Sequence, residues 1–332
     1  MSKHRLVIIG YGNVSRGVRA SIAKSADMEL VGIVSRSPER VKREVADLPV
    51  IAMENAEAEL QRLGAEIAIL GGGSKNDLPK FGPRFAKAID TVDSFDNHIH
   101  IPDHFAAMDE AAKSTGHVAV ISSGWDPGIF SMERTLAGAF LPGSRGYGFY
   151  GLGPAGGLSM GHSDALRTIP GVKDARQFTH AIPEAIERVR KGENPDFQPG
   201  DMHRRECFVV LEPGADPAAI SKTITEMPGY FAPYDTTINF VSEEELKERF
   251  GGFPHDGLVV AAGTTGNGNK ALVEYRCQWG SNPEATANVL VATARAVTRL
   301  RAEGKRGAFT ILDIPPAYFS PCSREELLKH WM

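Results

Sequence analysis

The stretch that decides the fold is RLVIIGYGNVSRG, residues 5–17. Its apolar run, Leu6 to Ile9, has the length of a buried strand and leads directly into a glycine-containing turn. Beyond the turn, Val14, Val18 and Ile22 recur at helical spacing. Strand, tight turn and helix in this order predict the first unit of a doubly wound α/β sheet.

The turn carries most of a phosphate-binding fingerprint. Gly10 and Gly12 supply the first two glycines of G-x-G-x-x-G, and Ser15 stands at the third position. The first glycine allows the tight turn and the second lets a pyrophosphate approach the backbone. The N–H groups of Asn13 and Val14, at the helix start, are placed to bind phosphate. A plain tight turn is the alternative, but the strand–turn–helix context favours dinucleotide binding.

The end of the second predicted strand indicates which dinucleotide is bound. In VGIVSRS, residues 31–37, Ser35, Arg36 and Ser37 stand where many such proteins place a carboxylate that accepts from the ribose 2′-OH of NAD. A cation and two hydroxyls would instead donate to a 2′-phosphate, so we expect the cofactor to be NADP. The alternative is that Arg36 is an ordinary solvated loop residue.

Further strand and helix patterns follow at short spacing up to HVAVISS, residues 117–123, and predict a Rossmann-type parallel sheet. GGGSKND, residues 71–77, ends one of these strands. We expect Gly72 and Ser74 to lie near the nicotinamide side of the cofactor, although this stretch could simply be a helix entry.

From residue 124 onward the pattern changes to longer strands of a mixed or antiparallel sheet, interrupted by helices and Gly/Pro-rich loops. This indicates a second, α+β domain. We expect a dinucleotide-binding domain over residues 1–122 and a second domain over residues 123–299.

Carboxylates follow two predicted strands of the first domain. Asp93 and Asp96 lie in VDSFDNH and Asp126 lies in SSGWDPG. Ligands of open parallel sheets bind beyond the carboxyl ends of the strands, and a carboxylate pair there suits a substrate ammonium group. A helix cap is the alternative for any single aspartate, Asp126 in particular.

In the second domain, HRRECF opens a strand with Arg204 and Arg205. Only one of these can face a pocket, because alternate strand side chains point to opposite faces. An arginine facing an enclosed site is the usual partner of a substrate carboxylate.

Composition excludes several classes of function. The formal net charge of −4 argues against a nucleic-acid partner, and no apolar run approaches the length that spans a bilayer. Three widely spaced cysteines suggest neither a disulfide framework nor a zinc site. His98, His100 and His104 lack an accompanying ligand set, so we expect no metal and read them as incidental loop residues. With no signal peptide predicted, we expect a cytoplasmic protein.

Together the motifs resemble the meso-diaminopimelate D-dehydrogenase family from the N-terminus to about residue 321. The matching stretches are GYGNVSRG, DMELVGIVSRS, TVDSFDNHIHIP, SSGWDPGIFS, GHSDALRTIPG, HRRECFVV, MPGYF, GGFPHDG and GAFTILDIPP. The resemblance implies a Rossmann-type domain that is completed by about 300–332, a second α+β substrate/dimerisation domain, and a homodimer. It implies reversible, NADP-dependent oxidative deamination of the D-centre of meso-2,6-diaminopimelate, which yields L-2-amino-6-oxopimelate and ammonia in lysine biosynthesis.

The resemblance also implies roles for individual residues. Asp96 and Asp126 would contact the D-centre ammonium as catalytic residues. The expected substrate-binding residues are Trp125, Tyr150, Met160, Thr179, Arg205, His255 and Asn269. The expected cofactor-binding residues are Gly10, Gly12, Asn13, Val14, Ser35, Arg36, Gly72 and Ser74.

Three features depart from some family members. Tyr150 stands where they have Trp, Met160 replaces a Gln near the substrate, and GPAGG is longer than in those members. These changes leave the substrate range open. Two other functions also stay open from the residues: a different NADP-linked oxidoreductase acting on a carbonyl or alcohol, and a non-catalytic NADP-sensing protein.

Overall fold

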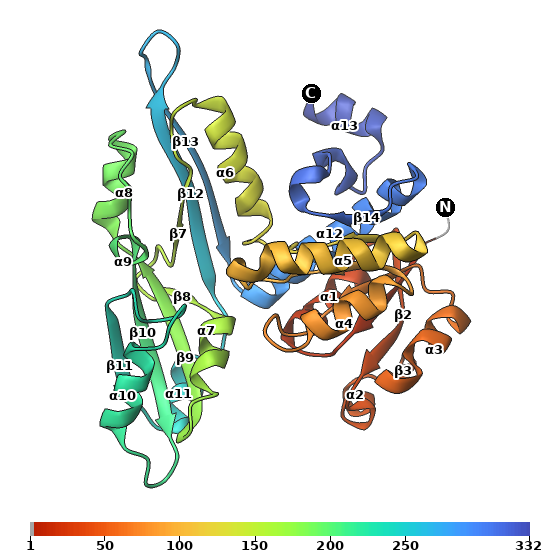
Figure 1. Ribbon diagram of the computed structural model, residues 1–332, viewed down its shortest axis with the longest axis horizontal. Coiled ribbons are helices and arrows are strands. Elements are labelled where there is room, and N and C mark those ends of the chain that lie inside the picture. The colour runs from red at the N-terminus through yellow and green to blue at the C-terminus, as the bar shows by residue number, and fades with distance from the viewer. Residues whose placement is uncertain (1–2) are drawn as a thin grey trace. The chain divides into compact units, whose positions relative to one another are not determined.

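The computed structural model describes residues 3–332, which divide into two compact units (Figure 1). The first unit runs to Met132 and resumes over Pro283–Met332, and the second is Glu133–Asn282. The expected boundaries lay at residues 122 and 299. The second boundary moves most, because the long helix α12 (Asn282–Ala302) buries its apolar face in the core of the first unit.

A seven-stranded sheet in the order β14-β6-β5-β4-β1-β2-β3 forms the centre of the first unit. Every pairing in it is parallel, which confirms the Rossmann-type sheet. The strands are β1 (His4–Ile9), β2 (Met28–Ser35), β3 (Val50–Ala52), β4 (Ile67–Leu70), β5 (Asp90–Asp93), β6 (Val118–Val120) and β14 (Gly307–Phe309).

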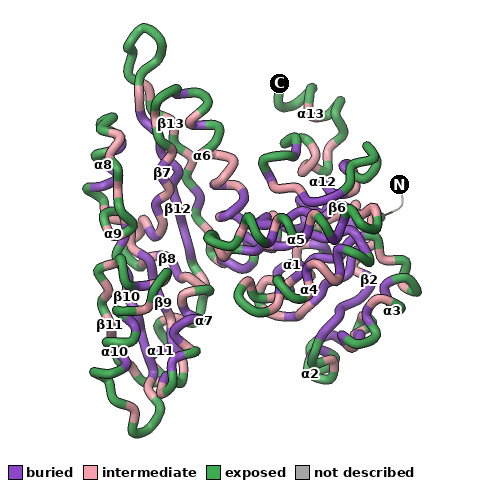
Figure 2. Tube along the Cα trace, viewed as in Figure 1, coloured by how far each residue is buried: buried purple, intermediate pink, exposed green. Residues whose placement is uncertain are grey.

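Helices cover both faces of this sheet, and the alternation of β1 shows how. Leu6 and Ile8 belong to the apolar cluster that includes residues of α1, α2 and α12, whereas Val7 and Ile9 belong to the cluster that includes residues of α3, α4 and α5. Both faces are therefore buried, as Figure 2 shows for the strands of the first unit. The helices are α1 (Asn13–Ala23), α2 (Pro38–Glu44), α3 (Ala56–Arg62), α4 (Leu78–Ala86), α5 (Ile101–Thr115) and, near the C-terminus, α13 (Arg324–Trp331).

Gly17 brings α1 and α12 together. A Cβ at this position would lie 2.9 Å from Cβ of Ala287 and 3.1 Å from Cα of Glu284. Any side chain here would separate the two helices, so the glycine sets their spacing.

The second unit contains two sheets of mixed or antiparallel pairing, as expected. One has the order β11-β10-β9-β8 and the other β13-β12-β7. The strands are β7 (Tyr147–Tyr150), β8 (Gly157–Leu158), β9 (Val172–Ala181), β10 (His203–Leu211), β11 (Thr236–Phe240), β12 (His255–Thr264) and β13 (Lys270–Trp279). The helices are α7 (Met160–Leu166), α8 (Pro183–Arg190), α9 (Pro199–Met202), α10 (Pro217–Thr225) and α11 (Glu243–Arg249), while α6 (Ile129–Phe140) crosses from the first unit.

Two apolar clusters lie on opposite faces of the four-stranded sheet. Leu166 of α7 and Ile220 of α10 pack on one face with Val209. Leu246 of α11 packs on the other face with Phe208. None of the helices in residues 3–332 combines the length and the apolar character that a membrane span requires.

The first unit also depends on a polar contact between distant parts of the chain. Arg295 of α12 is 8% exposed; its Nη2 donates to Asp27 Oδ1 at 2.9 Å and its Nη1 donates to the Phe319 carbonyl at 2.9 Å. The hydrogen bonds from Arg295 lower the pKa of Asp27, although partial burial opposes the shift. One side chain therefore joins α12, the residue that precedes β2 and the C-terminal segment.

We predict that Arg295→Met lowers the free energy of unfolding at pH 7 by about 2 kcal/mol, because a half-buried carboxylate and a carbonyl lose their donor. Urea denaturation of both proteins measures this. Since the folded-state pKa of Asp27 is lowered, the contribution is present above the unfolded value of about 3.9 and disappears as the pH falls through the folded value. The difference between the proteins should therefore shrink below about pH 4.

Arg19→Met is the matched control, because the partner of Arg19 is the well-exposed Asp47 at 2.7 Å. It should leave stability almost unchanged. Equal losses in the two variants would show that burial of Arg295 is not what matters.

Candidate active site

The turn after β1 has the geometry that a dinucleotide phosphate needs. Gly10 has φ of 87°, a left-handed conformation that favours glycine. A Cβ on Gly12 would meet no atom within 4 Å, so the backbone is open to a close approach. Gly12 is also the N-cap of α1 and offers no side chain to the first N–H groups of Asn13 and Val14. These donors can therefore bind an anion.

Ser15 occupies the third fingerprint position without loosening the packing. It is fully buried, and a Cβ on Gly71 would lie 2.0 Å from its hydroxyl oxygen. The extra volume of Ser15 is thus accommodated by a glycine at the end of β4. This complementarity explains why the motif tolerates a serine there.

A cavity of 230 Å³ opens beside this turn. Gly10, Gly12, Gly72, Ser35 and Arg36 all contribute to its wall, which brings together residues that end three different strands. Two hydroxyls and a guanidinium beside a phosphate-binding turn fit an adenosine ribose that carries a 2′-phosphate.

Two charged residues of this cavity were missed in the sequence. Arg40 of α2 lines the cavity, and its Nη2 donates to the Tyr11 carbonyl at 2.8 Å. Asp77 forms an ion pair with Arg36 at 3.0 Å between Nη1 and Oδ1. Arg40 lies four residues after Arg36, in the first turn of α2, so the sequence could have suggested it. Nothing in the local sequence relates Asp77 to Arg36.

The loop after β4 connects the cavity to the next strand end. Ser74 accepts a hydrogen bond from the Asp96 backbone N–H at 3.0 Å. Asp96 itself is exposed. The structure thus places the stretch expected beside the nicotinamide next to one of the two expected catalytic carboxylates.

Asp126 lies in the turn between β6 and α6. The Gly124 N–H donates to the Pro127 carbonyl at 2.8 Å and closes this turn. Trp125 is 6% exposed and meets Phe130 edge-on, with ring centroids 5.3 Å apart. A buried indole therefore supports the turn, in which Asp126 itself is half-buried.

Asp93 is not available to a substrate. It is fully buried, and its Oδ2 lies 2.8 Å from Nε2 of His104. His104 belongs to α5 and is 5% exposed, so reading it as an incidental loop histidine is wrong. His98 and His100 form a short exposed 3₁₀ turn. Within residues 3–332, no cluster of three or more His, Cys, Asp or Glu side chains could hold a metal.

In the second unit, alternation along β10 separates the two arginines. Arg204 has a side chain 65% exposed, whereas Arg205 is 8% exposed. Arg205 lies opposite Thr179 of β9, and its Nη1 donates to the Thr179 hydroxyl. The inward arginine is therefore Arg205.

Burial and aromatic contact define the surroundings of Arg205. Its guanidinium carbon lies 4.0 Å from the ring centre of Tyr234, a residue that the sequence did not single out. Burial lowers the pKa of Arg205 from its usual value. Its Nε and Oε1 of Gln177 are buried with no hydrogen-bond partner among residues 3–332, so polar atoms remain for a ligand.

A neutral histidine lies nearby. Burial and the charge of Arg205 lower the pKa of His203 to about 3. Its Nε2 accepts the Tyr150 backbone N–H at 3.0 Å, which a neutral imidazole can do. The Tyr150 ring stacks on His203 at 5.3 Å and meets His255 edge-on at 6.5 Å. Tyr150, His255, Thr179 and Arg205 therefore belong to one neighbourhood.

One expected substrate residue is placed elsewhere. Asn269 is exposed in the turn that joins β12 to β13, at the opposite end of β12 from His255, a separation of roughly 30 Å. Met160 is half-buried beside the apolar cluster around Phe178 and Phe208, and its contact with the substrate stays a prediction. The buried asparagine near His255 is Asn282, which donates to the Leu158 carbonyl at 3.2 Å.

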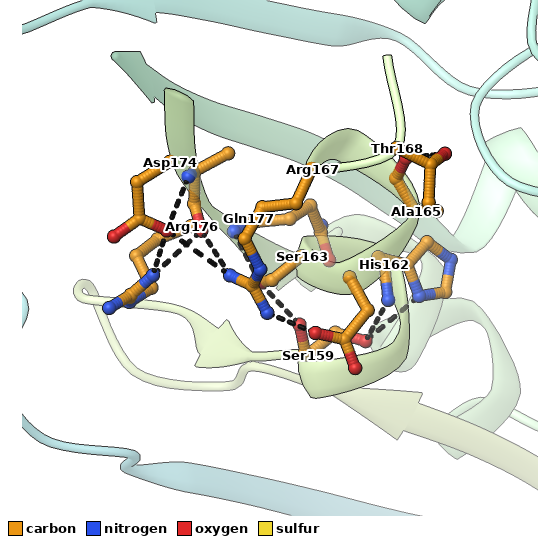
Figure 3. A network of polar contacts seen from close by, with 11 residues as sticks. Ser159, His162, Ser163, Ala165, Arg167, Thr168, Asp174, Arg176 and Gln177 are labelled. Atoms are coloured by element: carbon orange, nitrogen blue, oxygen red, sulfur yellow. Dashed lines mark hydrogen bonds and ion pairs between the residues drawn. The ribbon is translucent and has the colours of Figure 1, made fainter. Parts of the chain in front are cut away.

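The stretch GHSDALRTIPG ties α7 to β9, as Figure 3 shows. The Ser163 hydroxyl donates to the Ser159 carbonyl at 2.6 Å and accepts the Gln177 N–H at 2.9 Å. Arg167 donates to the Ala175 carbonyl at 2.8 Å. This motif holds the strand that carries Thr179 against its covering helix.

Comparison with known proteins gives one family. A family model described as the diaminopimelic acid dehydrogenase C-terminal domain matches residues 124–281. The meso-diaminopimelate D-dehydrogenase of Ureibacillus thermosphaericus is 47% identical over 329 residues, which is 99% of each chain.

Solved structures agree over the full length. A crystal structure of C. glutamicum DAP dehydrogenase in complex with DAP matches with a TM-score of 0.92 and 40% identity, over 100% of each chain. An engineered D-amino acid dehydrogenase bound to NADP⁺ matches with a TM-score of 0.90 and 38% identity, again over 100% of each chain. The chain described here therefore belongs to the meso-diaminopimelate D-dehydrogenase family.

Proposed function

We propose that this chain catalyses the reversible, NADP-dependent oxidative deamination of the D-centre of meso-2,6-diaminopimelate. The products are L-2-amino-6-oxopimelate and ammonia, and the reaction belongs to lysine biosynthesis. The observation that carries the proposal is full-length similarity at 40–47% identity to several meso-diaminopimelate D-dehydrogenases.

The test is direct. The protein is mixed with NADP and with meso-, LL- or DD-diaminopimelate, and the absorbance of the reduced cofactor is followed. Rapid reduction with the meso isomer and no reduction with the LL isomer, which has no D-centre, is the expected result. Absence of reduction with every isomer would contradict the proposal.

The cofactor is NADP, which supplies the hydride acceptor when it is bound. The turn at Gly10 and Gly12 and the first N–H groups of α1 would bind the pyrophosphate. Ser35 and Arg36 would bind the 2′-phosphate, and Arg40 adds a second cation in the same cavity. Gly72 and Ser74 would border the nicotinamide end.

Asp96 and Asp126 would receive the D-centre. Hydride departure from the carbon requires a neutral nitrogen, whose lone pair enters the forming imine. A carboxylate within hydrogen-bond reach pairs with the ammonium and then accepts its proton, directly or through water. Trp125 and Tyr150 would border the reacting carbon and restrict water. Water then attacks the imine and ammonia leaves.

Arg205, Thr179 and His255 would hold the distal L-amino-acid end. The buried guanidinium has an Nε–H without a partner among residues 3–332 and lies over the Tyr234 ring, so it can form an ion pair with a carboxylate in a poorly solvated place. Holding this end fixes which centre is presented for oxidation. Asn282, whose backbone N–H donates to the Phe253 carbonyl at 2.7 Å, would take the role expected of Asn269, because Asn269 lies in the far hairpin turn.

We also propose a homodimer that works in the cytoplasm without nucleic-acid or membrane partners. Family membership supports the dimer. Tyr150 and Met160, which depart from some members, would set the substrate range.

Cofactor selectivity gives one prediction. Arg36→Ala should weaken NADP binding by about 1.5–3 kcal/mol, roughly ten- to 150-fold, because a set of charge-assisted hydrogen bonds to the 2′-phosphate is lost. NAD binding should change little. Fluorescence titration of both cofactors against both proteins measures this, and equal efficiency of the unmodified protein with NAD and NADP would contradict it.

The carboxylates give another. Asp126→Asn should keep the fold and the Kd for NADP but depress kcat, by about a hundredfold, because the amide can neither pair with the ammonium nor accept its proton. Circular dichroism and cofactor titration serve as controls. An unchanged kcat in the folded variant would contradict the catalytic role of Asp126 and leave it a structural residue of the turn.

A third prediction concerns Arg205, the residue proposed to hold the distal carboxylate. Arg205→Met keeps an unbranched apolar stem and removes the cation, so kcat/KM for meso-diaminopimelate should fall by about 3 kcal/mol of transition-state stabilisation. A D-amino acid with an apolar side chain has no distal carboxylate and should lose far less. Arg204→Met, on the exposed face of the same strand, is the matched control. An equal fall for both substrates in Arg205→Met would reverse the proposed orientation.

A further inference from the structure

Strand β5 carries a buried carboxylate at each of its two ends. Asp90 is its first residue and Asp93 its last, and they are 1% and 0% exposed. Each carboxylate lies against a histidine: Asp90 against His117 at 3.2 Å and Asp93 against His104 at 2.8 Å. Two similar pairs thus lie at opposite ends of the same strand.

The Asp93 pair is at the carboxyl end of the strand. The reaction is proposed on this side of the sheet, since ligands of parallel sheets bind beyond the carboxyl ends of the strands. Asp93 Oδ1 accepts the Phe95 N–H at 2.9 Å and the Ser122 N–H at 3.0 Å. The Asp93 carbonyl accepts the Ser123 N–H at 2.8 Å. One residue therefore binds the backbone of both loops that carry the expected catalytic carboxylates.

These backbone contacts are close to the two carboxylates in sequence. Phe95 immediately precedes Asp96, and Ser122 and Ser123 begin the turn that contains Asp126. Ser122 has a φ of 52°, which a residue other than glycine adopts only when its surroundings hold it there. The bond from its N–H to Asp93 is part of that support.

His104 fixes Asp93 from the helix side. Oδ2 of Asp93 faces Nε2 of His104 at 2.8 Å, a position from which an imidazole N–H can donate to the carboxylate. The imidazole also stacks on Phe95, with ring centroids 4.1 Å apart and an angle of 16° between the planes. Helix α5 is thereby attached both to Asp93 and to the residue before Asp96.

We propose that Asp93 and His104 are positioning residues for the reaction, which set where Asp96 and Asp126 lie relative to each other. The inference rests on the proposed function. Both side chains are buried and act through the two loops. Loss of the His104 donor leaves a buried carboxylate with one partner fewer, and the loops it holds adjust to bring in another donor or water.

The Asp90 pair supplies a matched control on the same strand. Asp90 Oδ1 accepts the Val118 N–H at 2.9 Å and Nη1 of Arg301 at 2.7 Å. It therefore joins β5 to β6 and α12 as Asp93 joins its loops, but at the edge away from Asp96 and Asp126. Hydrogen bonds from His117 and Arg301 lower the pKa of Asp90 against the opposing effect of burial.

The experiment compares His104→Leu and His104→Gln with His117→Leu and His117→Gln, in full-length protein. We expect His104→Leu to lower kcat on meso-diaminopimelate by about ten- to a hundredfold, since small displacements of reacting groups cost this much. The Kd for NADP should stay within about twofold, because the phosphate-binding turn is untouched. His104→Gln, whose amide can donate to Asp93, should recover most of kcat.

The His117 variants should lose thermal stability to a similar extent but keep kcat within about twofold of the unmodified protein. Equal falls in kcat for His104→Leu and His117→Leu, or an unchanged kcat in His104→Leu, would overturn the proposal. If His104→Leu does not fold, Asp93→Asn and Asp90→Asn take the place of the leucine pair, with the same expected contrast in kcat. Failure of the proposed function would appear differently, as an unmodified protein that does not reduce NADP with meso-diaminopimelate.

Discussion

Parallel pairing of β1 with both β2 and β4 is the constraint on which the first unit depends. It directs three successive strand ends to one edge of the sheet, so that Gly10, Ser35 and Gly71 lie around one cavity although they are far apart in sequence. The same direction brings the loops after β5 and β6 to that edge. The proposed cofactor site and the two proposed catalytic carboxylates thus depend on strand order, and each loop needs only a few specific residues.

In the second unit, the main constraint is a buried charge, that of Arg205 on one face of a sheet. Arg205 is stabilised by the Thr179 hydroxyl and the Tyr234 ring, while the neighbouring His203 stays neutral. Because a second cation is avoided there, the local positive charge is reserved for an anionic group. A buried arginine with donors to spare is costly without such a partner, which is a physical reason to regard it as part of a binding site.

The sequence predicted the parallel sheet, the phosphate-binding turn and the Ser35–Arg36 end of β2, because these depend on local patterns. Alternation limited the inward arginine to one of two, and the family resemblance selected Arg205. What the sequence could not provide was long-range partnership. Asp77 beside Arg36 and Asp93 beside His104 are contacts between separate segments, and no spacing rule relates them.

The expectation for Asn269 failed for the same reason. Asn269 was assigned to the substrate from resemblance, yet it lies in a hairpin turn whose position is fixed by the register of β12 with β13. At the other end of the chain, only Gly307–Phe309 of the stretch GAFTILDIPP pairs with β6, and a 3₁₀ turn begins at Ile311. The pairing partner is a three-residue strand, so the ladder has no room to continue.

The close approach of α1 and α12 at Gly17 and Ala287 has a consequence for how the chain is made. The helix that completes one face of the first sheet is synthesised only after the whole second unit, and β14 follows later still. During synthesis, the apolar face formed by Leu6, Ile8 and Val18 therefore cannot pack against α12 until about 150 further residues have emerged from the ribosome. The second unit, continuous in sequence, is free to fold in that interval. The first unit becomes complete only when the last part of the chain arrives.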